Sequence, residues 1–246
     1  MAEGPWDSKV VLVTGSSSGI GEETARLFAR RGATVVINSA TSVAAGQAVA
    51  DSLPRASYVQ SVVGGEEEAA TLISTVIERH GRLDALINNA GTTAVIPHHD
   101  LAAASLDVWR RIFEVNVFGT WAVTVAAVDA LRATNGVVIN VSSIAGLRAT
   151  GSSIPYAASK AALNHQTILL AKVLGPQIRV NAVAPGLVDT PWTEDWDVIR
   201  EVVTAVAPLK RSAKPADVAK VIADLAESTY VTGQVVAIDG GLTIAT

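Results

Sequence analysis

Short apolar runs rich in Val and Ile recur along this chain, and most are followed by a stretch in which apolar residues have helical spacing. Runs that are apolar at nearly every position are typical of strands buried on both faces of a sheet. Strands that alternate with helices predict an α/β fold, a parallel, doubly wound sheet with helices on both faces. The seven expected strands are Lys9–Thr14, Thr34–Asn38, Ser57–Val63, Ala85–Asn88, Val137–Ser142, Arg179–Val183 and Val235–Asp239.

The segment between the first two strands carries the end signals of a helix. Its apolar residues from Ile20 to Phe28 fall on one stripe, acidic residues open the segment, and two arginines close it before Gly32. Acidic groups at the N-terminal end and basic groups at the C-terminal end suit the helix dipole, and glycine is a common stop signal. Further helices are expected at Ser42–Leu53, Glu66–His80, Ser105–Ala133 and Tyr156–Val173.

Composition excludes several classes of function. The chain has 246 residues, 49% hydrophobic and 17% charged, so it can bury a sizeable core, and we expect one domain over 1–246. The formal net charge is −4 with no basic run, so nucleic-acid binding lacks its electrostatic signature. Cysteine is absent, and the four histidines lack metal-site spacing, so neither thiolate chemistry nor a metal is expected. With no evident signal peptide or membrane-length apolar run, we expect a soluble cytoplasmic protein.

One long interruption breaks the alternating pattern, at about residues 187–212. It contains Trp192 and Trp196, two of the five tryptophans. Long inserts near the carboxyl ends of parallel strands are where such folds bind ligands. We therefore expect this insert to form a substrate loop.

A glycine-rich turn follows the first strand. The stretch VTGSSSGIGEE places Gly15, Gly19 and Gly21 between that strand and the first helix. Glycine allows a tight turn and close approach of a ligand, and a helix N-terminus offers N–H groups to a pyrophosphate. The spacing is neither that of the broader G-x-G-x-x-G fingerprint nor that of a Walker A loop. Its strand–turn–helix setting predicts a dinucleotide site.

The residue that selects the form of the dinucleotide should follow the second strand. An acidic side chain there favours a free ribose 2′-OH and a basic one a 2′-phosphate. The segment INSATS has neither, and Asn38, Ser39, Thr41 and Ser42 offer only hydrogen-bond donors. NADP(H) is favoured because nothing repels a phosphate, and NAD(H) stays possible.

Three motifs in order give a specific resemblance. T-G-x-x-x-G-I-G from Thr14, N-N-A-G from Asn88 and Y-x-x-x-K from Tyr156 to Lys160 resemble those of the short-chain dehydrogenase/reductase family of the ordinary, single-domain type. The likeness runs from about Lys9 to Leu242 and implies a Rossmann-type sheet and a nicotinamide-dependent oxidoreductase. It implies hydride transfer between nicotinamide and a ketone or secondary alcohol, and within that class we favour a carbonyl reductase.

The resemblance implies catalytic roles for four residues. Tyr156 would be the acid/base, and Lys160, one helical turn away, would lower its pKa from the ordinary value near 10. Ser143 would hydrogen-bond the substrate oxygen; Ser142 is the competing candidate, and only the thirteen-residue spacing to Tyr156 favours Ser143. Asn116 matches the family asparagine that holds a water beside the lysine.

The family pattern also implies which residues surround the cofactor. Asn88 is expected to have a structural role at least as much as a binding one. The full expected set is Gly15, Ser17, Ser18, Gly19, Ile20, Gly21, Asn38, Ser39, Thr41, Val63, Asn89, Gly91, Tyr156, Lys160, Pro185, Gly186, Val188 and Thr190. One departure stands out: Val62 occupies the place of an Asp that contacts adenine in many relatives, so that side-chain hydrogen bond is lost.

The substrate pocket is expected around Ser143, Ala145, Arg148, Ile154, Trp192 and Trp196, with residues 92–96 as a further wall. Most of these are apolar, which favours a hydrophobic or aromatic substrate over a small charged one.

Two alternatives stay open. The first is reduction of 3-oxoacyl thioesters on acyl carrier protein, for which Arg110, Arg111, Arg132, Arg148 and Lys172 are scattered basic candidates. The second is a non-catalytic nucleotide sensor on the same fold, although such a protein would be free to lose the Tyr–Lys pair. The resemblance also implies a homotetramer built through the helices at Ser105–Ala133 and Tyr156–Val173.

Overall fold

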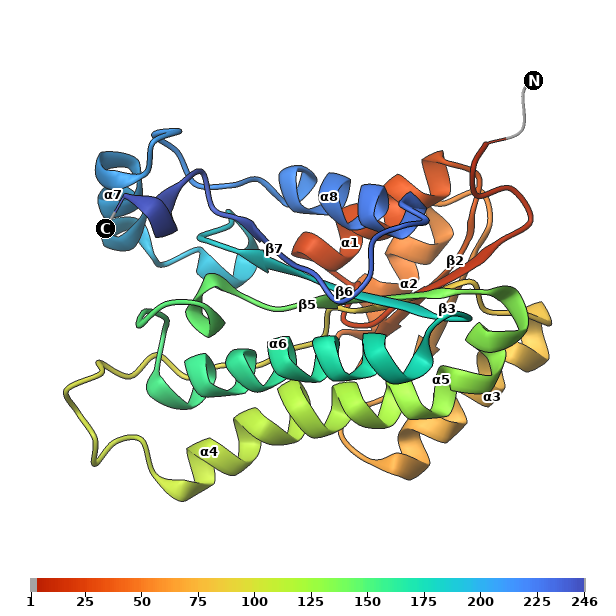
Figure 1. Ribbon diagram of the computed structural model, residues 1–246, viewed down its shortest axis with the longest axis horizontal. Helices are drawn as coiled ribbons and strands as arrows, with labels where there is room; N and C mark the ends of the chain where they lie inside the picture. Colours follow the sequence, from red (N-terminus) through yellow and green to blue (C-terminus); the bar gives the residue numbers. More distant parts are fainter. Residues whose placement is uncertain (1–3, 246) are drawn as a thin grey trace.

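The structure is a computed structural model that describes residues 4–245, and its centre is a seven-stranded parallel sheet (Figure 1). The strand order is β3-β2-β1-β4-β5-β6-β7, and every neighbouring pair is parallel. The strands are β1 Val10–Val13, β2 Thr34–Ser39, β3 Ala56–Gln60, β4 Ala85–Asn88, β5 Val137–Val141, β6 Arg179–Pro185 and β7 Val235–Ile238. The predicted α/β doubly wound sheet is confirmed.

Helices cover both faces of this sheet (Figure 1). One face packs against α1 Gly19–Arg30, α2 Val43–Asp51 and α8 Pro215–Glu227, and the other against α3 Glu66–His80, α5 Thr120–Thr134 and α6 Ile154–Leu174. Because side chains alternate along a strand, Val11 and Val13 enter the first core and Val10 and Leu12 the second. The apolar runs in the sequence are thus explained by burial on both sides.

The strand order reverses beside β1. The chain builds outward from β1 through β2 to β3, then returns to place β4 on the other side of β1. Loops leaving the carboxyl ends of β1 and β4 therefore diverge and leave a crevice between them. This crevice is where the glycine-rich turn lies.

A predicted single helix at Ser105–Ala133 is divided in the structure. It consists of α4 Leu106–Phe113, a π-helical turn Glu114–Gly119 and α5. At Gly119, a Cβ would lie 2.7 Å from the carbonyl oxygen of Val63, so the chain needs glycine for this close approach. π-Helical turns inside α-helices frequently mark functional sites, and this one carries Asn116.

The insert after β6 contains a helix that the sequence did not predict. The 3₁₀ turn Pro191–Thr193 is followed by α7 Asp197–Val206, which lies at one end of the molecule, beyond the sheet (Figure 1). Helix α8 was not predicted either, although Pro215 stands in its first turn, where proline is favoured. The third strand was predicted too long: β3 ends at Gln60, and Val62 is exposed.

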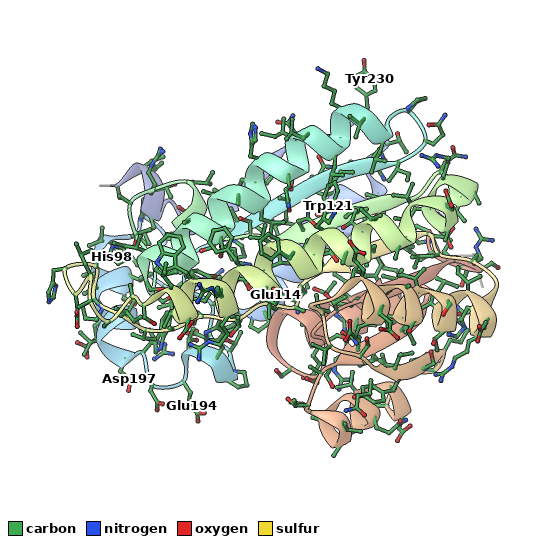
Figure 2. All side chains as sticks on the ribbon, turned by 90° about the horizontal axis from the view of Figure 1, so that it is seen from below. His98, Glu114, Trp121, Glu194, Asp197 and Tyr230 are labelled. Atoms are coloured by element: carbon green, nitrogen blue, oxygen red, sulfur yellow. The ribbon has the colours of Figure 1, made fainter. Side chains whose placement is uncertain are left out.

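Residues 106–134 are long and apolar enough to cross a membrane, by length and composition alone. Half of their most apolar window is buried inside the molecule, where α5 packs on the sheet and α3. In both views this helical stretch and α6 lie side by side, with Trp121 on the helix surface (Figure 2). It is a core helix of this fold.

Candidate functional site

A large cleft opens at the carboxyl ends of the strands, with a volume of about 1210 Å³. Segments after β1, β2, β4, β5 and β6 line it, and α7 forms a further wall. Of the predicted cofactor set, all but Gly21 line the cleft. A Cβ at Gly21 would lie 2.5 Å from both the Asn89 amide nitrogen and the Gly15 carbonyl oxygen, so this glycine serves the packing beneath the turn.

The glycine-rich turn has the geometry of a phosphate cradle. Gly15 and Gly19 both have φ of +60°, a conformation that favours glycine. A Cβ at Gly15 would lie 2.8 Å from the Cα of Ala90. Helix α1 starts at Gly19, and the Ser18 side chain makes no capping bond to it. Its first N–H groups are thus left for another acceptor, so these residues fit the pyrophosphate of a dinucleotide.

The four predicted ribose contacts differ in burial and in the hydrogen bonds that they already make. Asn38 is buried, with its Nδ2 donating to the carbonyls of Val59 and Ser61 at 3.1 and 3.0 Å. The Ser39 hydroxyl lies 2.9 Å from the Tyr58 hydroxyl. Asn38 therefore holds the crevice together, while Thr41 and Ser42 are exposed at its rim.

Helix α6 carries the Tyr–Lys pair into the cleft. Its N-cap residue Ser153 accepts a hydrogen bond from the Tyr156 N–H, which fixes the first turn. Lys160 follows one turn later with its Nζ 5.7 Å from the Tyr156 ring centre. That Nζ donates to the Val141 carbonyl at 2.9 Å, and Lys160 is only 4% exposed. The ammonium is therefore held between α6 and the end of β5.

The two serines after β5 point in different directions. The Ser142 hydroxyl donates to the Lys160 carbonyl at 3.3 Å, so it ties β5 to α6. The Ser143 hydroxyl accepts from the Ala145 N–H at 3.1 Å and is also hydrogen-bonded to Tyr156. Of the two candidates, Ser143 is the one placed beside the tyrosine.

Burial has the largest effect on the pKa values of Tyr156 and Lys160. It raises the pKa of Tyr156 to about 12, while the hydrogen bond with Ser143 acts in the opposite direction. Burial also lowers the pKa of Lys160 to about 8. The expectation that Lys160 lowers the Tyr156 pKa is not met here: burial sets the direction of the shift, and Ser143 is the group that opposes it. Tyr156 is therefore protonated at neutral pH.

Asn116 lies behind the cleft rather than on its wall. It is fully buried, and its amide accepts from the Thr92 N–H at 2.8 Å and donates to the Thr92 carbonyl and the Ser159 hydroxyl at 3.0 Å each. Ser159 in turn donates to the Tyr156 carbonyl at 2.7 Å. Asn116 thus joins the π-helical turn to the segment after β4 and to the first turn of α6.

The segment after β6 closes the cleft over the glycine turn. Pro185, Gly186, Val188 and Thr190 line it, and a Cβ at Gly19 would lie 3.3 Å from the Thr190 methyl group. A Cβ at Gly91 would lie between 3.4 and 3.7 Å from Asn116, Lys160 and Trp192. These two glycines keep the floor of the cleft open, as a flat nicotinamide ring would need.

Five of the six predicted substrate residues line the cleft: Ser143, Ala145, Arg148, Trp192 and Trp196. Ile154 does not, because it starts α6 on the outside. The contribution of α7 was not predicted: its Ile199, Val202, Val203 and Val206 all line the cleft. Their i, i+3, i+4, i+7 spacing was the available signal.

A charged cluster anchors α7 to the segment after β6. Arg200 donates to the Asp189 carboxylate at 2.9 Å and to the Thr193 carbonyl at 3.0 Å, and the Ser212 hydroxyl donates to Asp189 at 2.7 Å. Burial would raise the pKa of Asp189, but the bonds from Arg200 and Ser212 outweigh it and hold that pKa below its usual range. These bonds tie α7 to the segment after β6.

Comparisons with known proteins agree on one family. Residues 15–243 match the family model described as Enoyl-(Acyl carrier protein) reductase. Ketoacyl reductase 2 of the granaticin polyketide synthase from Streptomyces violaceoruber is 53% identical over 98% of each chain. The 3-oxoacyl-[acyl-carrier-protein] reductase of Thermotoga maritima is 40% identical over 97% of this chain and 99% of the relative. A crystal structure of a short-chain dehydrogenase/reductase from Burkholderia xenovorans has a TM-score of 0.90 and 40% identity, covering 96% of this chain and 98% of that one.

The buried ammonium predicts a stability gain on its removal. A pKa lowered from 10.5 to about 8 corresponds to about 3 kcal/mol of unfolding free energy lost at pH 7. Lys160→Met removes that cost and leaves the Val141 carbonyl without its donor, which costs roughly 1–3 kcal/mol. We expect the variant to be as stable as the native protein at pH 7, or up to about 2 kcal/mol more stable.

The pH dependence of the unfolding free energy tests whether the buried charge of Lys160 causes this difference in stability. The native protein should regain stability as the pH rises from the folded pKa near 8 towards the unfolded value, so its unfolding free energy relative to that of Lys160→Met should rise by about 2 kcal/mol between pH 7 and pH 10. Urea unfolding at fixed protein concentration measures this difference. Parallel curves for the two proteins would show that Lys160 carries no buried charge.

Proposed function

The chain belongs to the short-chain dehydrogenase/reductase family, and we propose that within this family it is a carbonyl reductase. It is accordingly a nicotinamide-dependent oxidoreductase that acts on a ketone or a secondary alcohol. The observation that carries the proposal is the meeting of Tyr156, Ser143 and Lys160 at the floor of one cleft whose other end is the glycine turn. We propose further that residues 1–246 act as one cofactor-binding and catalytic domain in the cytoplasm.

The roles of the residues follow from their contacts. When bound, the nicotinamide cofactor supplies the hydride that reaches the carbonyl carbon. Tyr156 donates its phenolic proton to the carbonyl oxygen, and the Ser143 hydroxyl hydrogen-bonds the same oxygen as negative charge develops there. Lys160 stabilises the phenolate that remains, and Asn116 with Ser159 holds the first turn of α6 in place. A secondary alcohol and the oxidised cofactor leave.

The protonation state of Tyr156 supports the reductive direction. A phenol with a pKa of about 12 is protonated throughout the physiological range, and reduction of a ketone requires a proton donor. Alcohol oxidation would require the phenolate, which is a minute fraction at neutral pH.

NADP(H) is the proposed form of the cofactor. No Asp or Glu is among the residues that line the cleft, so no carboxylate there repels a 2′-phosphate. The exposed hydroxyls of Thr41 and Ser42 supply donors at the ribose end. NAD(H) remains the alternative, because no cation stands there to pair with the phosphate.

A substrate with an apolar body suits the opposite end of the cleft. Trp192, Trp196 and the apolar stripe of α7 form one wall there. The alternative is a 3-oxoacyl thioester carried on acyl carrier protein. It is supported by the printed names of the two relatives, while the net charge of −4 offers a docking acidic carrier no favourable field. A non-catalytic sensor is opposed by the intact Tyr–Lys pair.

The decisive experiment follows NADPH and NADH oxidation across a panel of ketones with apolar substituents. We expect turnover with NADPH, and a loss of at least 100-fold in kcat for Tyr156→Phe, because phenylalanine cannot donate a proton. Tight nucleotide binding without turnover in either protein would contradict the reductase proposal and favour the sensor.

The pH dependence of the rate follows from the pKa of about 12. Ketone reduction should be flat from pH 6 to about pH 7.5 and should fall only as Lys160 loses its charge near its pKa of about 8, whereas alcohol oxidation gains phenolate as the pH rises. Initial rates in both directions at saturating cofactor measure this. A reduction rate that falls between pH 6 and pH 7 would contradict Tyr156 as the donor.

We also propose a homotetramer. Phe118, Trp121 and Val125 are exposed along the π-helical turn and α5, and Ile168, Leu169 and Val173 along α6. Contiguous apolar surface of this kind marks protein–protein contact. Light scattering should return four times the mass of 25.4 kDa; a monomer mass would reject the assembly.

A further inference from the structure

The charge distribution in the cleft is one-sided. Of the residues that line it, only Arg148 and Lys160 are charged. Two acidic residues at the start of α7 and just before it, Asp197 and Glu194, point away from the body of the molecule (Figure 2). The charged side chains on the cleft wall are therefore all basic, which favours anions beside them.

Arg148 has no structural task that would explain its charge. Its guanidinium donates only to the carbonyl of its neighbour Leu147, at 3.3 Å, and within residues 4–245 no carboxylate lies within 4.0 Å of it. The arginines around α7 differ, since Arg200 and Arg211 are paired with aspartates. Lys160 is also different, because the Val141 carbonyl and the catalytic phenol account for it.

The loop that carries Arg148 is fixed to the catalytic floor. The N–H groups of Leu147 and Arg148 both donate to the Ile144 carbonyl at 2.9 Å. A Cβ at Gly146 would lie 2.6 Å from the backbone of Lys160, so the loop packs directly on α6. The base of Arg148 thus has a defined position five residues after Ser143, although its side chain is exposed.

The cofactor phosphates do not explain Arg148. The glycine turn follows β1, whereas Arg148 follows β5, and β4 lies between them. Two strand spacings are roughly 10 Å. Arg148 lines the same cleft as Thr93 and Ser152, whose hydroxyls lie 2.5 Å apart. Arg148 is therefore placed to meet a ligand on the Ser143 side of the cleft.

We propose that Arg148 binds a carboxylate carried by the substrate, at the end remote from the ketone. This inference rests on the proposed reductase function and narrows the substrate to a ketone that has an apolar body and a carboxylate. A guanidinium pairs with a carboxylate through two parallel N–H···O bonds. The wall offers one cation and no second, which matches one negative charge better than the two of a phosphate ester.

The test compares acids with their methyl esters, which keep the shape and remove the charge. 4-Acetylbenzoate and 4-oxocyclohexanecarboxylate are each paired with their ester, for the native protein, Arg148→Gln and Arg148→Lys. Arg30→Gln, on the exposed outer side of α1, is the control. We expect Arg148→Gln to lower kcat/KM for the acids about 10- to 100-fold, mainly through KM, and to change the esters less than threefold.

Three outcomes would overturn the inference. They are an equal loss for acid and ester, a native protein that prefers the esters, and a loss of the same size in Arg30→Gln. Arg148→Lys should keep part of the preference for acids, and added salt should raise KM for the acids alone, because screening weakens an exposed ion pair.

A binding measurement separates this inference from the proposed function. Titration of benzoate in the presence of NADP⁺, followed by tryptophan fluorescence to which Trp192 and Trp196 contribute, requires no turnover. Binding to the native protein that is weakened at least tenfold in Arg148→Gln supports the carboxylate site, even if no ketone is reduced. Equal binding to both proteins rejects the site, even if ketones are reduced.

Discussion

A lysine ammonium buried without a carboxylate is the constraint around which the site is built. Lys160 reaches a single main-chain acceptor, the Val141 carbonyl at the end of β5. Gly146 allows close packing beside it, because a Cβ there would lie 2.6 Å from the Lys160 backbone. An acidic partner would satisfy the ammonium more fully, but it would also compete with the phenolate for it. The protein therefore sacrifices stability to keep an unneutralised positive charge next to Tyr156.

The same absence of carboxylates extends through the whole cleft. In the sequence, acidic residues outnumber basic ones, 23 to 19. Folding places the acids on outer helix faces and in ion pairs such as Asp189–Arg200, which lie outside the catalytic floor. The net charge of −4 belongs to the whole molecule, whereas the charged side chains that line the cleft, Arg148 and Lys160, are both positive. A dinucleotide and an acidic substrate are both suited to these positive charges.

The sequence was most informative where one physical requirement dominates. Burial of β1 and β4 on both faces gave runs such as Val10–Val13 that predict a parallel sheet, and the fold class is confirmed. The short β3, at the edge of the sheet, lacked this requirement and its end was misplaced. Helix α7 was not predicted, although its apolar residues have helical spacing. The pKa of Tyr156 could not be predicted from the i, i+4 spacing, since it is raised by burial, which depends on tertiary packing.

The π-helical turn at Glu114–Gly119 also has a consequence beyond holding Asn116. A π-turn amounts to one extra residue in a helix, and one residue advances the helical phase by about 100°. Residues 106–113 and 120–134 therefore follow separate angular registers, and the face on which Trp121 and Val125 stand is set by this offset. Deleting one residue from the turn would rotate that apolar face away from its present direction while releasing Asn116 from Ser159. The direction of this exposed apolar face and the hydrogen bonds of Asn116 would then change together, so the two are mechanically coupled through one irregular turn.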